Sequence, residues 1–120
     1  MIYIVSTQRT LYKESPDIIF CDLDLGIYQL KKLFETGEVA VDSETTGLDA
    51  ISCDVLTWQF GTKEDQLVIE MIYPGALMWI KYIFKTYSDT LWLFQNAKFD
   101  LKFLMKEGIY PKNVYDTFLA

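Results

Sequence analysis

The sequence has no histidine, only two cysteines and fewer basic than acidic residues, and each shortage excludes a class of site. Without histidine, a zinc site is not expected. Cys21 and Cys53 do not form a C-x-x-C pair, so we expect two buried thiols and neither a disulfide nor a thiolate metal site. The net charge of −6 argues against broad electrostatic adhesion to DNA or RNA, which depends on an excess of Lys and Arg.

Long apolar runs are missing as well. No stretch approaches the roughly 20 apolar residues of a membrane span, and residues 1–6 lack the length and the basic lead of a secretory signal. We therefore expect a cytoplasmic protein, of a bacterial cell or a phage-infected host, with no membrane partner. The 120 residues, 51% of them hydrophobic, suit a single domain, and no repeat or linker divides them.

Apolar segments rich in β-branched and aromatic residues predict the strands. They lie at about 2–6, 17–21, 39–43, 54–61, 66–72, 91–95 and 113–116. Three consecutive strands, followed by alternating helices and strands, predict an α/β fold whose mixed β-sheet is flanked by helices. Residues 1–37 are interpreted as an N-terminal strand and helix extension at the sheet edge, within the domain 1–120.

Helical spacing of apolar residues predicts three helices. The first runs from Leu25 to Glu35, with Asp24 as its N-cap and Gly37 beyond its end. Its apolar stripe consists of Ile27, Leu30, Leu33 and Phe34. The second covers 77–87 after Pro74 and Gly75, and the third begins near Ala97.

Two carboxylates follow the buried part of the third predicted strand. Asp42 and Glu44 are two residues apart, so they point to the same face. Two anions at this separation repel each other unless a cation or a basic group lies between them. By itself the Asp-x-Glu pattern is also typical of a solvated strand end that precedes a tight turn at 45–47.

Asp100 is the second unusual carboxylate. It lies opposite the stripe formed by Lys98, Lys102 and Lys106, which we expect to face water, so Asp100 points inward. A buried carboxylate needs a metal ion, a basic partner or several N–H donors. The alternative is a first-turn aspartate that the helix dipole favours.

These segments resemble a known family. Residues 42–49 (DSETTGLD) resemble the first motif, and residues 96–100 (NAKFD) the second, of the proofreading 3′-5′ exonuclease domain of DNA polymerase I-type (family A) polymerases, members of the DEDD exonuclease superfamily. Residues 114–120 (VYDTFLA) resemble the Asp-Thr-x-Leu-Ala segment that follows there. The resemblance covers roughly 38–120 and implies a ribonuclease H-like fold with the first motif on the central strand.

The resemblance also implies catalytic roles. Asp42 would bridge two Mg²⁺ or Mn²⁺ ions, Glu44 would hold the ion that carries the attacking water, and Asp100 would serve the second ion. Two ions about 3.5–4 Å apart can activate water on one side of phosphorus and stabilise the departing 3′ oxygen on the other. The expected activity is hydrolysis of single-stranded DNA from its 3′ end.

Further residues are implied as substrate contacts. Leu48 and Phe99 resemble the apolar residues that pack on the terminal bases, and such packing tolerates any base. Asn96, Thr45 and Thr46 are placed by the resemblance at the 3′ nucleotide. In the third segment, Asp116 is expected to support the site without ligating metal.

The third motif of the family, a Tyr or His four residues before an Asp, has no counterpart in this sequence. We therefore expect a domain that is incomplete at its C-terminus, truncated before that motif and inactive alone. A polymerase domain or a second chain would then supply the rest. Two alternatives remain open: a ribonuclease D-like RNA 3′ exonuclease, and a degenerate non-catalytic module that binds nucleic acid or a partner.

Overall fold

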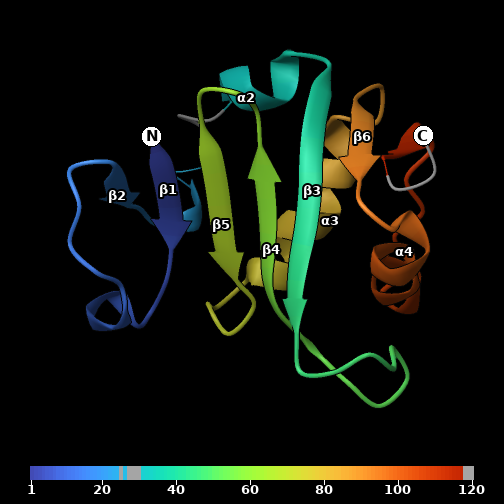
Figure 1. Cartoon of the computed structure of the whole chain (residues 1–120), viewed down its shortest axis with the longest axis horizontal. Helices are drawn as coiled ribbons and strands as arrows, with labels where there is room; N and C mark the ends of the chain where they lie inside the picture. Colours follow the sequence, from blue (N-terminus) through green and yellow to red (C-terminus); the bar gives the residue numbers. More distant parts are fainter. Residues whose placement is uncertain (25, 27–30, 118–120) are drawn as a thin grey trace.

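The computed structural model describes residues 1–24, 26 and 31–117. Its centre is a seven-stranded sheet with the order β2-β1-β5-β4-β3-β6-β7 (Figure 1). The strands are β1 (Ile2–Val5), β2 (Ile18–Phe20), β3 (Glu38–Thr45), β4 (Val55–Gly61), β5 (Gln66–Glu70), β6 (Leu91–Phe94) and β7 (Val114–Asp116). Each predicted strand is present, and the predicted α/β class is confirmed.

The sheet is mixed because its middle is antiparallel and its two sides are parallel. β4 pairs antiparallel with β3 and with β5. β1 pairs parallel with β2 and β5, and β6 pairs parallel with β3 and β7. The first strand of the chain therefore joins the sheet beside β5, with Ile2 opposite Gln66.

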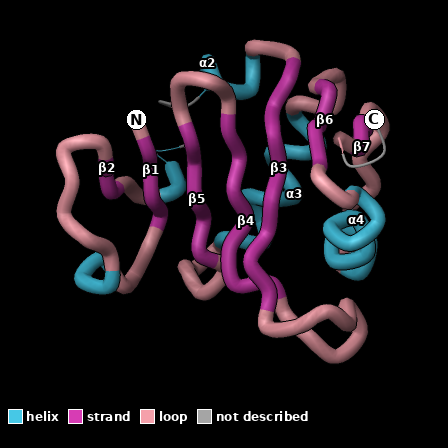
Figure 2. The backbone as a smooth tube through the Cα atoms, in the orientation of Figure 1, coloured by secondary structure: helices cyan, strands magenta, loops and turns pink. Residues whose placement is uncertain are grey.

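The helices are η1 (Arg9–Leu11, a 3₁₀ turn), α2 (Lys31–Glu35), α3 (Ala76–Thr86) and α4 (Ala97–Lys106). α3 lies behind β3 and β4 (Figure 2) and buries Ile80, Ile83 and Phe84. α4 lies on the same side, because Phe103 and Leu104 share the wall of a cavity of about 200 Å³ with Trp58 of β4 and Ile80 of α3.

The first predicted helix is described only in part. Leu33 and Phe34 are buried as predicted, and Gly37 follows the helix with φ +87°. Leu25, Ile27 and Leu30 lie outside the described residues, as do Phe118, Leu119 and Ala120 of the third motif-like segment. Asp24 is already helical, so it is not the N-cap that we expected; instead the carbonyl of Asp22 accepts the Gly26 N–H at 2.9 Å.

The residues of strand β3 alternate between the two faces of the sheet. Val39 and Val41 are buried against the helices, whereas Ala40, Asp42 and Glu44 are exposed. The exposed face holds a groove of about 400 Å³. Residues from β3 to β6 line it, among them Ala40, Asp42, Gln59, Gln66 and Leu93, together with Gln95.

Tyr12 fastens the segment between β1 and β2 to the sheet. Its hydroxyl donates to Oε2 of Glu70 at 2.5 Å, and Glu70 is 8% exposed. Burial, together with the hydrogen bond and charge of Glu70, raises the pKa of Tyr12 to about 12. Oε1 of Glu70 is buried without a hydrogen-bond partner in the described part of the chain. Tyr12 therefore offsets part of the cost of burying this carboxylate.

Candidate active site

Asp42 and Glu44 lie in the second half of the central strand β3. They are exposed on the open face, where Asp42 pairs with Gln59 and Glu44 with Thr57 of β4. Asp42 also lines the groove on this face together with Gln95, which follows β6. The two-residue repeat of the strand thus brings both carboxylates to the same side, as the spacing predicts.

Asp100 lies in the first turn of α4 and is 2% exposed, so it points inward as its position opposite the lysine stripe predicts. Its Oδ1 accepts a hydrogen bond from the hydroxyl of Ser43 at 2.5 Å. The backbone N–H of Ser43 in turn donates to Oδ1 of Asp42 at 2.9 Å. Ser43 therefore connects the carboxylate on the strand to the carboxylate on the helix.

Ser43 did not appear among the residues that we predicted from the sequence. The signal that could have identified it is the alternation of the strand, because a residue between two outward carboxylates must point toward the helices. A hydroxyl at that inward position can donate to Asp100, whereas an apolar side chain cannot.

Burial is the main reason that the pKa of Asp100 rises from 3.8 to about 6. The hydrogen bond from Ser43 lowers this pKa, and the charges of Asp42 and Asp116 raise it further. Asp42 is therefore close enough to Asp100 for the two charges to interact. A hard divalent cation would relieve this repulsion, and carboxylate oxygens are the donors that Mg²⁺ and Mn²⁺ prefer.

The predicted ligands nevertheless do not form a finished metal site. Among residues 1–24, 26 and 31–117, no three or more His, Cys, Asp or Glu side chains form a group that could hold a metal ion. Glu44 is exposed on the open face, whereas Asp100 is bonded to Ser43 on the helix side. Asp42 and Asp100 both carry carboxylate oxygens, the donors that a hard divalent cation prefers.

Asp116 supports α4, the helix that carries Asp100. Its two carboxylate oxygens accept the backbone N–H groups of Asn96 at 3.0 Å and of Ala97 at 2.9 Å. These amides are at the start of the helix, where N–H groups lack partners within the helix. Asp116 on β7 therefore satisfies and holds this helix end, a function that β7 can perform only because it pairs with β6.

The residues that the resemblance places at the substrate lie at the start of α4 and on the loop between β3 and β4. Asn96 precedes α4 with φ +59°, a conformation that asparagine tolerates better than most residues. Phe99 is half-buried with its ring 5.3 Å from that of Phe103. Leu48 is 87% exposed on the loop between β3 and β4.

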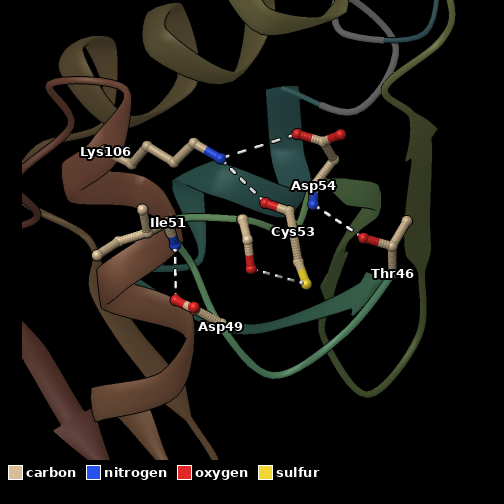
Figure 3. A network of polar contacts seen from close by, with 7 residues as sticks. Thr46, Asp49, Ile51, Cys53, Asp54 and Lys106 are labelled. Carbon is tan, nitrogen blue, oxygen red and sulfur yellow. Dashed lines mark hydrogen bonds and ion pairs between the residues drawn. The ribbon is translucent and has the colours of Figure 1, made fainter.

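That loop is closed by hydrogen bonds (Figure 3). Thr45 Oγ1 donates to the carbonyl of Gly47 at 2.8 Å, and Thr46 exchanges hydrogen bonds with the backbone of Asp54. Cys53, which we predicted to be buried, is only half-buried here. Lys106 is exposed, as expected for the lysine stripe, and its Nζ also contacts the loop.

The sequence matches the model of the 3′-5′ exonuclease family over residues 21–120. Because the match covers most of the chain, the protein belongs to this family. The resemblance to 3′-5′ exonucleases that the two motifs indicated is thereby confirmed. The curated proteins include no match.

Solved structures of exonucleases share the fold. The catalytic core of RRP6 from Trypanosoma brucei superposes with a TM-score of 0.65 at 21% identity, over 98% of this chain and 29% of that one. RNase D from Escherichia coli, an exoribonuclease involved in structured RNA processing, superposes with a TM-score of 0.64 at 15% identity. The match covers 95% of this chain and 26% of RNase D. NrnC from Brucella melitensis with bound Mg²⁺ superposes with a TM-score of 0.57 at 20% identity. The match covers 97% of this chain and 48% of NrnC.

These similarities show that the fold is the ribonuclease H-like fold of DEDD-type exonucleases. The chain spans between about a quarter and a half of the length of those proteins. Within its described portion, none of the helices combines the length and apolar character that crossing a membrane requires.

Proposed function

We propose that this chain is the N-terminal part of a proofreading 3′-5′ exonuclease domain of a DNA polymerase, which hydrolyses single-stranded DNA from the 3′ end. The observation that carries the proposal is the connection of Asp42 on β3 to the buried Asp100 on α4 through Ser43. By resemblance, these two residues stand in the first and second motifs of a 3′-5′ exonuclease.

Asp42, Glu44 and Asp100 would hold Mg²⁺ or Mn²⁺ in the complete site. Bound ions would supply an activated water and neutralise the departing 3′ oxygen. Thr45, Thr46, Leu48, Asn96 and Phe99 would contact the terminal nucleotides.

Asp116 would keep α4, and with it Asp100, in position. The last metal ligand would come from a third motif, on the same polypeptide or on a second chain, with a polymerase domain as a further partner. This chain alone should therefore cleave little or no DNA.

The direct test uses a longer polypeptide that extends through a downstream Tyr-x-x-x-Asp. With Mg²⁺ it should shorten 5′-labelled single-stranded DNA progressively from the 3′ end. Asp42→Ala should abolish this activity, and Lys102→Ala, at an exposed position on α4, should leave it unchanged. An Asp42→Ala protein as active as the wild type would refute the assignment of the site.

A second candidate is a ribonuclease D-like RNA 3′ exonuclease, which the similarity to RNase D and RRP6 supports. DNA and RNA oligonucleotides of one sequence, offered to the same longer polypeptide, distinguish the two candidates. Faster shortening of the RNA would favour the second, because only the sugar and the thymine methyl differ between the substrates.

A non-catalytic module is the third candidate, and the lack of a finished three-carboxylate group among the described residues favours it. A protein that binds metal only when folded is stabilised by that metal. Millimolar Mn²⁺ should therefore raise the melting temperature of this chain and leave that of Asp42→Ala nearly unchanged. The absence of any shift in the wild type would favour the non-catalytic module.

A further inference from the structure

The loop of residues 46–54, which joins β3 to β4, has a defined conformation of its own (Figure 3). The N–H of Thr46 donates to the carbonyl of Asp54 at 2.9 Å, and the N–H of Asp54 returns a bond to Thr46 Oγ1 at 3.0 Å. Asp49 accepts twice, from the N–H of Ile51 at its side chain and from the N–H of Cys53 at its carbonyl. Hydrogen bonds thus join the two ends of the loop to each other and connect residues within it.

Packing inside the loop is tight as well. A Cβ atom placed on Gly47 would lie 2.6 Å from Sγ of Cys53, far inside normal contact distance. No side chain larger than hydrogen therefore fits at Gly47 without moving Cys53. The two sides of the loop touch at this point.

Lys106, near the end of α4, connects this loop to the helix that carries Asp100. Its Nζ donates to the carbonyl of Cys53 at 2.9 Å and lies 3.8 Å from Oδ1 of Asp54 (Figure 3). Lys106 is exposed, as are Lys98 and Lys102 of the same stripe. A charged hydrogen bond to a backbone carbonyl, supported by a carboxylate, fixes the loop more firmly than a neutral bond.

The fixed loop presents two large apolar side chains to solvent. Leu48 is 87% exposed and Ile51 is 91% exposed. They belong to the loop that continues directly from β3, the strand of Asp42 and Glu44. Two exposed apolar side chains on an ordered loop that follows the strand of Asp42 and Glu44 are suited to the faces of unstacked bases, since such contacts do not depend on base identity.

We propose that Ile51 joins Leu48 in contacting the unpaired bases at the 3′ end of the substrate, and that Lys106 is the positioning residue that fixes this loop. The inference rests on the proposed function. A loop that is already ordered loses less conformational freedom when the strand binds, so Lys106 strengthens binding without touching the substrate.

The test measures binding of a fluorescent single-stranded DNA oligonucleotide to this chain by anisotropy, with Mn²⁺ present. Lys106→Met and Ile51→Ser should each raise Kd by about tenfold, the effect expected when a charged hydrogen bond or a buried apolar contact is lost. Lys106→Arg should recover most of the affinity. Lys102→Met and Leu11→Ser are the matched controls, and both should bind as the wild type does. Both residues are exposed, and Leu11 lies in η1, between the two strands at the other edge of the sheet.

Hydrogen exchange gives a readout that does not need substrate. In Lys106→Met the amides of Cys53 and Asp54 should exchange faster, while those of β3 keep their protection. Unchanged exchange would overturn the positioning role, and wild-type affinity in Ile51→Ser would overturn the base contact. If the wild-type chain binds neither DNA nor RNA, the proposed function fails, and this inference fails with it.

Discussion

Replacing Asp100 with asparagine removes a carboxylate that the fold holds out of water. Because the pKa of Asp100 rises from 3.8 to about 6 on folding, the native state keeps a proton that the unfolded chain releases. The stability of the wild type should therefore fall as pH rises from about 4 to about 6. At pH 7 the free energy of unfolding should be lower by the full effect of this pKa shift, about 3 kcal/mol.

Asparagine keeps the shape of the side chain, and its carbonyl oxygen can still accept the hydroxyl of Ser43. Relative to the wild type, Asp100→Asn should therefore gain stability with rising pH, by up to about 3 kcal/mol at pH 7. With a urea m-value of about 1.5 kcal/mol/M, the midpoint should move by about 2 M.

Urea unfolding of both proteins at half-unit steps between pH 4 and pH 7.5 measures this difference. The exposed Asp89 provides a control, since Asp89→Asn should follow the wild-type curve. Subtracting the wild type cancels the carboxylates that do not interact with Asp100. If the curves of Asp100→Asn and the wild type run parallel, the raised pKa of Asp100 is refuted.

Three further variants test the supports of the fold and site. Ser43→Ala removes the hydrogen bond that lowers the pKa of Asp100, so stability should fall more steeply between pH 4 and pH 7 than in the wild type, in the same urea series. Asp116→Ala should cost about 1–2 kcal/mol in urea unfolding and increase hydrogen exchange in the first turn of α4. Tyr12→Phe removes the hydrogen bond from Tyr12 to Glu70 and should lower the free energy of unfolding by about 1–3 kcal/mol at pH 7, measured by urea unfolding. Equal stability of variant and wild type would show that Tyr12 does not offset the burial of Glu70.

The local structure of the chain could be predicted from sequence because it depends on side-chain periodicity. Val39 and Val41 alternate with exposed residues, and this pattern alone gives both the strand and the shared face of Asp42 and Glu44. Asp100 points inward for a similarly local reason, its angle to the lysines on α4.

The remaining features depend on which segments lie together in space. Nothing in the periodicity says that β1 pairs with β5, or that the hydroxyl of Ser43 reaches Asp100. Lys106 is exposed as its place in the stripe predicts, but its hydrogen bond could not be predicted, because the carbonyl of Cys53 is a backbone group that leaves no mark in the sequence pattern. The error at Asp24 has a local cause, since the helix begins earlier than its apolar stripe.

The place of β1 in the sheet affects how the protein can be shortened. The family match begins at residue 21, so a truncated protein could be started there. However, β1 pairs with β5 along its whole length. Removing residues 1–20 would turn β5 into an edge strand with unpaired N–H and C=O groups, a template for association with other chains. Residues 1–20 therefore protect the edge of β5 from pairing with other chains, and protein expressed without them should be insoluble.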